Sequence, residues 1–343
     1  MSVIKFSVPS NIAFVKYWGK KGRQLPLNPS LSMTLAHCYT EMSIDYIIDT
    51  ENPGIDEFIF EGQEQEKFKI KIQKYLSDIS DVFPLGKNLR LKIKSKNTFP
   101  HSAGIASSAS AMGALACCLT QIESEIDGSA SFDQNPDDFR KRATLLARLA
   151  SGSASRSIYP GFVSWGRNQI LEDSSDEYAM VVSDIHEDFG QLHDSVLIVS
   201  QDPKSVSSTE GHRLMNAHSF KEARIEQANE NYRVLLNALK HGEWEGFGEV
   251  LENEALTLHG LMMSSDPSYV LLLPQSLTLI EKIRKYRVEL GLKMFFTIDA
   301  GPNIHLIYPE DCKTEVLEFI ENHLAQDCKF VIHDMIGKGP KKL

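Results

Sequence analysis

Two hydrophobic patterns alternate along the 343 residues of this chain. Segments in which apolar and polar side chains alternate predict strands, whereas apolar residues three or four positions apart predict amphipathic helices. In the first half, we expect strands at residues 3–8, 12–18, 32–48, 89–93, 161–165 and 179–182. In the second half, we expect strands at residues 196–200, 294–298, 304–308 and 330–333.

Helical spacing marks several longer segments. The clearest helix start is Asn135-Pro136-Asp137-Asp138, where a capping side chain is followed by a proline and by acidic residues near the positive helix end. Strands precede helices in the first half and mix with them in the second, which predicts an α+β fold and not a doubly wound sheet. Helices are expected at residues 65–77, from the alanine-rich run to about 123, from 136 to about 150, and at 219–240, 244–263, 276–290 and 316–324.

Length and composition favour two globular domains. A chain of 343 residues exceeds the usual size of one core, and a boundary near residues 184–192 predicts domains of residues 1–187 and 188–343. The content of 42% hydrophobic and 24% charged residues fits a soluble globular protein. No apolar run approaches membrane-spanning length, and the first residues lack the pattern of a signal peptide, so we expect a cytoplasmic location.

Charge, cysteine content and the absence of common motifs further limit the classes of function that the sequence favours. The formal net charge of −10 argues against a general nucleic-acid binder but does not exclude anionic substrates, which local fields hold. The five cysteines form no C-x-x-C pair, so we expect reduced thiols and no structural zinc. The sequence also lacks the P-loop, the dinucleotide-binding fingerprint, H-E-x-x-H and G-x-S-x-G.

One stretch, Phe99 to Ala116, indicates phosphate binding. Its first half is a turn of small residues, and its second half is an alanine-rich run. A small-residue loop that enters a helix presents unpaired backbone N–H groups at the positive end of the helix dipole, which suits a phosphate. Ser107 and Ser108 add hydroxyls for phosphate oxygens or Mg²⁺. The alternative is a close-packed buried helix whose small residues merely admit a neighbouring element.

Four segments stand out in combination, and in this order they resemble the diphosphomevalonate decarboxylase family of the GHMP kinase superfamily. The stretch above resembles the superfamily's nucleotide loop, P-x-x-x-G-L-x-S-S-A. The short segment Val206–Thr209 is a further match, and the resemblance runs from about residue 8 to residue 339. The four segments are Asn11–Lys20 with Leu25–Ser32, the nucleotide loop, Ser151–Arg156 with Gly161–Trp165, and Asp299–Asn303.

The resemblance implies a fold and a reaction. The expected architecture is the GHMP kinase fold, with an N-terminal domain like ribosomal protein S5 domain 2, a ferredoxin-like C-terminal domain, and the active site between them. The family uses ATP and Mg²⁺ to convert mevalonate 5-diphosphate to isopentenyl diphosphate, ADP, phosphate and CO₂. The 3-hydroxyl is phosphorylated first, and phosphate then departs as the carboxylate is lost. The family also implies a homodimer.

Three side chains carry the chemistry by the same resemblance. Asp299 is implied to orient the attacking hydroxyl or take its proton, and Lys16 to lie close enough to keep that carboxylate ionised. Arg156 is implied to grip the substrate carboxylate with its planar fork of donors. Without the resemblance, Asp299 reads as a turn aspartate, Arg156 as a helix-terminal cation and Lys16 as a surface residue on an edge strand.

The remaining site residues are assigned in the same way, and Ser107 and Ser108 are also the candidates for contact with Mg²⁺. The residues implied to contact substrate are Asn11, Tyr17, Lys20, Ser151, Ser153, Ser208 and Thr209. Those implied to contact nucleotide are Pro100, Ser102, Ala103, Gly104, Ile105, Ala106, Ser107, Ser108 and Ala109.

A few departures from the family pattern leave alternatives open. Thr209 replaces a basic residue seen in some members, which leaves one cation fewer for the terminal phosphate. A phosphomevalonate decarboxylase that acts on mevalonate 5-phosphate is therefore an alternative. A mevalonate 3-kinase and a non-catalytic GHMP-fold nucleotide-binding regulator are others, and the presence of the three chemistry-bearing residues argues against both. The other departures are Ile105 for leucine, His101 after Pro100, and Pro29 where serine is common.

Overall fold

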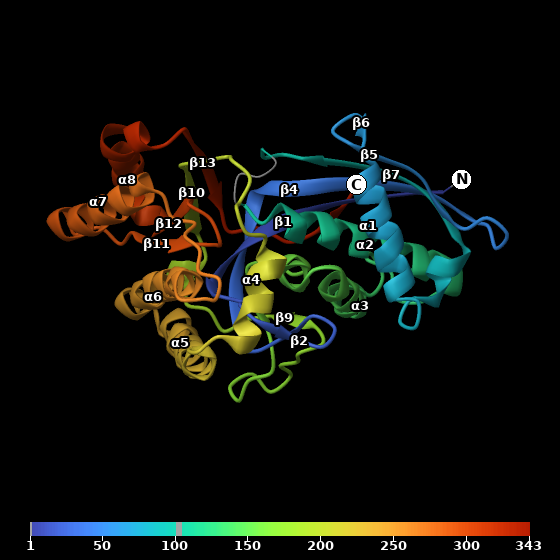
Figure 1. Cartoon of the computed structure of the whole chain (residues 1–343), viewed down its shortest axis with the longest axis horizontal. Coiled ribbons are helices and arrows are strands. Elements are labelled where there is room, and N and C mark those ends of the chain that lie inside the picture. Colours follow the sequence, from blue (N-terminus) through green and yellow to red (C-terminus); the bar gives the residue numbers. More distant parts are fainter. Residues whose placement is uncertain (1, 101–104) are drawn as a thin grey trace.

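The computed structural model describes residues 2–100 and 105–343. Within them, one half of the molecule is built on an eight-stranded, mostly antiparallel sheet and the other on a four-stranded antiparallel sheet (Figure 1). The order of the larger sheet is β14-β1-β4-β7-β5-β6, with β8 paired to β4 and β9 paired to β8. Its strands are β1 (Ser2–Val15), β4 (Ser30–Ile48), β5 (Gly54–Phe60), β6 (Gln63–Glu64), β7 (Leu89–Asn97), β8 (Phe162–Trp165), β9 (Ala179–Val181) and β14 (Lys341–Lys342).

Three helices lie against the larger sheet (Figure 1). The alanine-rich helix is buried along most of its length, because its small side chains let the sheet approach closely. At Gly113, an added Cβ would lie 2.9 Å from Val8 Cγ1 of β1. The packed-helix alternative and the phosphate-loop interpretation are therefore compatible, since the first turn and the body of the helix have different surroundings. The helices are α1 (Glu66–Asp78), α2 (Ser107–Asp127) and α3 (Pro136–Ala150).

The smaller sheet has the order β11-β12-β10-β13 and is covered on both faces. Alternate residues of β11 divide between the two layers, with Phe295 facing α5 and α6 and Phe296 facing α7 and α8. The strands and helices are β10 (Leu192–Ile198), β11 (Phe295–Ile298), β12 (Ile304–Pro309), β13 (Phe330–Met335), α5 (Lys221–His241), α6 (Trp244–Met263), α7 (Pro274–Leu290) and α8 (Lys313–Phe319).

A shared hydrophobic core joins the two sheets. Phe14 at the end of β1 packs edge-on against Phe247 of α6, with 5.4 Å between ring centroids, and Val196 of β10 lies in the same cluster. The end of the chain also returns to the larger sheet, because β14 pairs with β1. Among the described residues, no helix combines the length and apolar character needed to cross a membrane.

The structure corrects several sequence-based expectations. β1 is one strand that continues through Pro9 and ends at Val15, where two strands reaching residue 18 were expected. A register shift next to Pro9 accommodates the missing N–H. Asn135 makes no capping bond to the backbone of α3, since its side-chain amide donates instead to Asp138. Several elements were not expected, among them the strand β5 and the short helix α4 (Ser208–Leu214).

Two short hairpin strands, β2 (Lys20–Lys21) and β3 (Leu25–Pro26), complete the segment that follows β1. They matter for the site because β1 reaches its last ladder pair, Val15 with Leu31, just before Lys16. The chain therefore leaves the large sheet at Lys16 and enters the space between the two halves of the molecule.

Candidate active site

Lys16 and Asp299 meet between the two sheets. Lys16 directly follows β1, and Asp299 directly follows β11 in the turn that leads to β12. Lys16 Nζ donates to Asp299 Oδ1 at 2.8 Å, although the two residues are 283 positions apart. The Lys16 side chain is 2% exposed and that of Asp299 is 29% exposed, so the carboxylate is the member of the pair that faces the cleft.

The electrostatics of this pair favour an ionised carboxylate. Burial lowers the pKa of Lys16, while the charge and hydrogen bond of Asp299 act in the opposite direction. Burial acts to raise the pKa of Asp299, but the charge and hydrogen bond of Lys16, with His305 and Lys204, hold that pKa below its usual range. Asp299 is therefore a carboxylate at neutral pH and is available as a hydrogen-bond acceptor.

Arg156 is a buried cation that lacks a full set of partners. It lies in a short 3₁₀ segment, Gly152–Ser157, and is 2% exposed. Within the described residues, its Nε and Nη1 atoms have no hydrogen-bond partner, and its guanidinium lies 6.0 Å from the Trp165 ring. Burial lowers the pKa of Arg156 to about 10, so it stays charged at neutral pH. Unpaired donors on a buried cation form a receptor for an anion such as a carboxylate.

Tyr17 is held beside Arg156 by close packing. Its ring lies edge-on to Trp165 at 4.8 Å, and a Cβ added to Gly152 would meet the tyrosine hydroxyl at 2.7 Å. The Tyr17 hydroxyl is buried and has no hydrogen-bond partner among the described residues. Burial raises the pKa of Tyr17, so the hydroxyl keeps its proton and can donate to an anionic ligand.

Asn11, Ser151 and Ser153 surround the segment that carries Arg156. Asn11 Nδ2 donates to Ser153 O at 3.1 Å and to Ser157 Oγ at 2.8 Å. The Ser151 and Ser153 hydroxyls lie 3.3 Å apart. The structure therefore brings these three predicted residues together and shows that Asn11 ties β1 to the arginine segment.

Lys20 lies in β2, which follows Tyr17 in the chain, and Ser208 and Thr209 lie at the start of α4. Lys20 Nζ donates to Gln24 Oε1 at 2.9 Å, and burial lowers the pKa of Lys20. Ser208 and Thr209 are exposed and form the first turn of α4. The helix docks onto the segment after β1 through His212, whose Nδ1 accepts from Gly19 N–H at 2.9 Å. This contact brings the α4 residues and Lys20 to the same side of the cleft.

The predicted nucleotide loop is described only in part, because Ser102, Ala103 and Gly104, like His101, lie outside the described residues. Ser10 Oγ donates to Ile105 O at 2.8 Å, which anchors the loop to β1. Ala106 has a left-handed backbone, with φ of 33°, and precedes α2 without a side-chain cap. Ala109 N–H donates to Ala106 O at 2.7 Å, so the N–H groups of Ser107 and Ser108 are the ones that suit an external acceptor. Ser107 is half-buried, and Pro100 and Ser108 are exposed.

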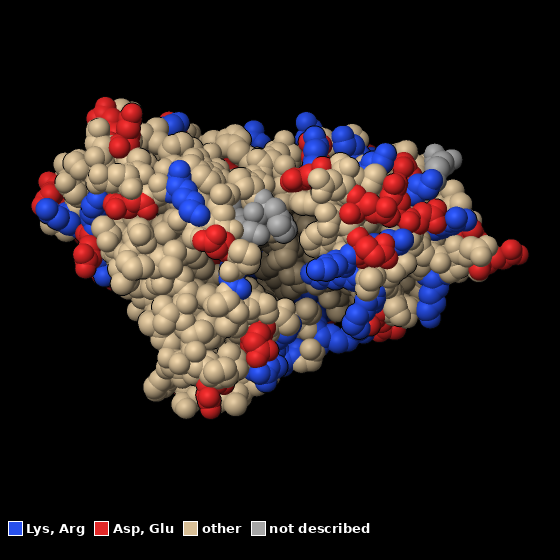
Figure 2. Space-filling model, turned by 45° about the horizontal axis from the view of Figure 1, so that its top comes forward, with Lys and Arg blue, Asp and Glu red and all other residues tan. Residues whose placement is uncertain are grey.

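Figure 2 shows a hollow near the middle of this face, with basic side chains along part of its rim. The described residues contain no cluster of three or more His, Cys, Asp or Glu side chains that could hold a metal ion. A separate groove of about 650 Å³, between α5 and α6, is lined by Arg224 and includes none of Lys16, Arg156 and Asp299.

The structure adds residues that sequence reasoning missed. His212 packs against Tyr17 and Trp18 in tilted arrangements, with ring centroids 4.4 and 4.8 Å away. His259 Nε2 lies 3.1 Å from Asp299 O, on the turn that carries the carboxylate. Lys204 approaches the same turn at Gly301. In the sequence, the only signal for Lys204 is its position shortly before Val206–Thr209. The histidines are scattered along the chain, so nothing singles out His212 or His259.

Comparisons with known proteins agree with this geometry. Residues 8–178 match the sequence model of the diphosphomevalonate decarboxylase-like N-terminal domain, and residues 195–343 match that of the mevalonate 5-diphosphate decarboxylase C-terminal domain. Diphosphomevalonate decarboxylase of Saccharomyces cerevisiae is 29% identical over 338 residues, or 93% of this chain and 82% of that protein. The Ganoderma lucidum protein of the same name is 28% identical over 340 residues, with the same two shares.

Solved structures give the same result. Mevalonate diphosphate decarboxylase from Staphylococcus aureus has a TM-score of 0.84 at 29% identity, covering 99% of this chain and 98% of that one. A complex described as MDDEF with MVAPP, AMPPCP and magnesium has a TM-score of 0.83 at 28% identity, with the same coverage.

The sheet topology and these structural matches show that the protein has the GHMP kinase fold. This result confirms the α+β fold class that the sequence predicts. Within that class, the chain belongs to the diphosphomevalonate decarboxylase family, which confirms the resemblance found in its sequence.

Proposed function

We propose that this protein is an ATP-dependent decarboxylase that converts mevalonate 5-diphosphate to isopentenyl diphosphate, ADP, phosphate and CO₂. The observation that carries the proposal is one cleft that holds an ionised Asp299 paired to Lys16 and a buried Arg156 with unpartnered donors. The first group suits activation of a hydroxyl, and the second suits recognition of a carboxylate. Family membership supports the same reaction.

In the first step, Asp299 accepts a hydrogen bond from the substrate 3-hydroxyl and orients its oxygen towards the γ-phosphate of ATP. Lys16 keeps Asp299 ionised through the 2.8 Å contact. As the oxygen–phosphorus bond forms, the hydroxyl proton moves to Asp299 and ADP leaves with the electron pair of its bond to phosphorus.

In the second step, Arg156 holds the substrate carboxylate by charge-assisted hydrogen bonds from its free donors. The bond between the carboxyl carbon and C2 breaks, and its electron pair forms the new double bond between C2 and C3. The 3-phosphate leaves with the electron pair of the C–O bond, so that CO₂ and phosphate depart and no redox partner is needed. Exclusion of water around Arg156, at 2% exposure, strengthens its hold on the carboxylate.

The substrate diphosphate is assigned to the segment after β1 and the start of α4. Tyr17 donates its hydroxyl and Lys20 supplies a cation, while Ser208 and Thr209 offer hydroxyls from the first turn of α4. Asn11, Ser151 and Ser153 support the carboxylate end, where Asn11 already ties β1 to the Arg156 segment.

The nucleotide is assigned to the loop from Pro100 to Ala109 and to the start of α2. The uncapped N–H groups of α2 suit the ATP phosphates, and the Ser107 and Ser108 hydroxyls suit Mg²⁺. When bound, Mg²⁺ neutralises charge on the β- and γ-phosphates. The related MDDEF complex with MVAPP, AMPPCP and magnesium supports the use of ATP and Mg²⁺.

We also infer two domains, residues 1–187 and 188–343, of the ribosomal-protein-S5-like and ferredoxin-like types. The separate eight- and four-stranded sheets support this division, although β14 lies on the larger sheet. A homodimer and a cytoplasmic location stay predictions from the family resemblance and the sequence.

A second candidate is decarboxylation of mevalonate 5-phosphate. The observation that favours it is that Thr209 is neutral, while Lys20 donates to Gln24 and Arg213 of α4 is paired with Glu210. We expect the diphosphate to be the better substrate, because Lys20, Tyr17, Ser208 and Thr209 together match two phosphates better than one.

A side-by-side assay tests the proposal. Purified protein is given ATP and Mg²⁺ with either mevalonate 5-diphosphate or mevalonate 5-phosphate, and ADP and CO₂ are measured together. We expect equal amounts of ADP and CO₂, with the larger kcat/KM for the diphosphate. ADP without CO₂ would identify a 3-kinase, and neither product from either substrate would identify a nucleotide-binding regulator.

A further inference from the structure

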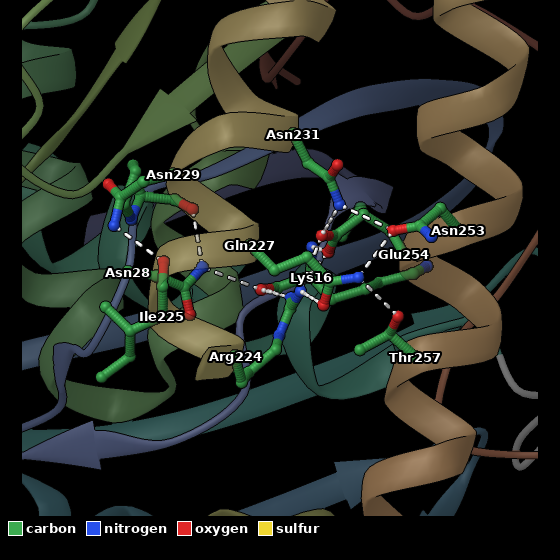
Figure 3. Close-up of polar contacts among 12 residues, drawn as sticks. Lys16, Asn28, Arg224, Ile225, Gln227, Asn229, Asn231, Asn253, Glu254 and Thr257 are labelled. Carbon is green, nitrogen blue, oxygen red and sulfur yellow. Dashed lines mark hydrogen bonds and ion pairs between the residues drawn. The ribbon is translucent and has the colours of Figure 1, made fainter. Parts of the chain in front are cut away.

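The main chain of Lys16 is held by side chains and not by a neighbouring strand. Its N–H donates to Glu254 Oε2 at 2.8 Å. Its C=O accepts from Asn28 Nδ2 at 3.1 Å and from Arg224 Nη2 at 3.3 Å. Figure 3 shows Arg224 and Glu254 reaching Lys16 from the two adjacent helices α5 and α6. Both backbone groups that follow the last pair of β1 are thus fixed from outside the strand.

Arg224 and Glu254 form the most deeply buried Arg–carboxylate pair of the described residues, at 1% and 0% exposure. The pair is bidentate, with Nη1 donating to Oε1 at 2.7 Å and Nη2 to Oε2 at 2.6 Å. Asn231 Nδ2 donates to Oε1 at 2.7 Å as well. A buried pair of this kind gains little stability over a well-packed apolar pair, because both charges lose their water. Its rigid geometry is the property that apolar side chains would not supply.

We propose that the Arg224–Glu254 pair is a positioning device for Lys16, an inference that rests on the proposed function. Neither residue is among those assigned to substrate or nucleotide, and the pair acts by fixing the peptide groups on both sides of the Lys16 Cα. A shift of the Lys16 backbone would change the 2.8 Å contact between Nζ and Asp299 and thereby the orientation of the reacting carboxylate. Catalytic geometry tolerates displacements of only about 0.5 Å.

The side chains assigned to the substrate diphosphate are anchored separately. Tyr17 is fixed by Trp165 and Gly152, and Lys20 by Gln24, and none of these contacts involves α5 or α6. Loss of the Arg224–Glu254 pair should therefore reduce kcat while leaving KM for both substrates nearly unchanged. A merely structural pair would alter stability but not this split, because each folded molecule would turn over normally.

The experiment compares three variants with the wild type in the decarboxylation assay. Arg224→Met with Glu254→Leu removes both charges together, so that no buried charge is left unpaired. Arg224→Lys keeps the charge but loses the bidentate fork and the contact with Lys16 O. The matched control is Glu252→Gln on the same helix, which removes a carboxylate that accepts from Arg284 at 2.9 Å and from Arg287 but does not touch Lys16.

We expect the double variant to lose at least tenfold in kcat and Arg224→Lys about threefold to tenfold. KM should stay within about threefold in both, and Glu252→Gln should keep wild-type kcat. Wild-type kcat in the double variant would overturn the positioning role, and if that variant does not fold, wild-type kcat in Arg224→Lys overturns it. A wild-type protein that turns over neither mevalonate phosphate refutes the proposed function itself, which separates the two failures.

Discussion

At the scale of single residues, the site is built from ionisable side chains whose burial determines their state. Arg156 is charged, and among the described residues two of its nitrogens have no hydrogen-bond partner, which is the basis for its proposed role as a receptor for an anion. His212 shows the opposite case, because burial and the nearby charges of Lys20 and Arg156 lower its pKa to about 3. A neutral His212 accepts from Gly19 N–H through Nδ1, which leaves the proton on Nε2.

Neutral burial of His212 predicts acid sensitivity. The pKa of His212 falls from its ordinary 6.5 to about 3 on folding, so below pH 6.5 the unfolded chain binds a proton that the folded chain does not. Stability is therefore fully present above pH 6.5 and is lost as the pH falls towards 3. Between pH 7 and pH 5 this group alone should cost about 2 kcal/mol of unfolding free energy.

Denaturant unfolding at several pH values measures this effect. His212→Met should be less stable at pH 7, because Gly19 N–H loses its acceptor, but its stability should fall less steeply between pH 7 and pH 5. An unchanged pH slope in the variant would show that His212 is not the proton-linked group. His259, whose pKa burial lowers to about 4, should keep its own part of the slope in both proteins.

At the scale of elements, the docking of α6 against β11 depends on a glycine. A Cβ placed on Gly248 would lie 1.9 Å from Phe295 Cδ1, far inside van der Waals contact. On the same helix, a Cβ on Gly260 would meet nothing within 4 Å. We expect Gly248→Ala to lower the unfolding free energy by about 1–3 kcal/mol through overpacking. Gly260→Ala should raise it by up to about 1 kcal/mol, because alanine favours the helix.

Urea unfolding of the two glycine variants tests this prediction. Their unfolding midpoints can be compared directly if their m-values are equal. A Gly248→Ala protein as stable as Gly260→Ala would show that Phe295 moves aside at little cost. The absence of a side chain at Gly248 would then not be what allows α6 to pack against β11 at this distance.

Among the helices and strands, some can be predicted from the sequence and others cannot. The amphipathic helices α5, α6 and α7 were placed within a few residues because their apolar spacing is local. The sequence does not reveal the continuity of β1 through Pro9, because pairing with β4 and a register shift offset the local cost of proline. It also does not reveal α4, whose seven residues owe their place to His212 and the segment after β1.

The candidate site divides in a similar way. Lys16, Arg156 and Asp299 can be predicted as site residues because their neighbouring residues form recognisable motifs. Arg224 and Glu254 lie in ordinary amphipathic helices, where a single charged residue on the apolar face is indistinguishable from many others. Their role follows only from the long-range contacts to Lys16.

At the scale of the whole molecule, the site is also a junction. Lys16 follows strand β1 of the larger sheet, and Asp299 follows strand β11 of the smaller sheet. Their ion pair therefore links the two halves of the molecule beside the shared hydrophobic core. Asp299→Asn keeps a hydrogen-bond acceptor but leaves the charge of a lysine with 2% exposure without its counter-charge. We expect turnover to fall by about 10²–10⁴ and the unfolding free energy to fall by about 1–3 kcal/mol. Nucleotide affinity should be retained, because the start of α2 is untouched.

A second substitution separates the catalytic and structural parts of this link. In Asp299→Leu the lysine charge stays buried and unpaired, whereas Lys16→Met combined with Asp299→Leu removes the charge as well. The double variant should regain stability over the single variant in urea unfolding, because an apolar pair replaces an isolated buried cation. Its CO₂ release should remain absent, because no group is left to orient the 3-hydroxyl. Recovery of turnover together with stability would mean that the pair only joins the two halves and that the reacting carboxylate lies elsewhere.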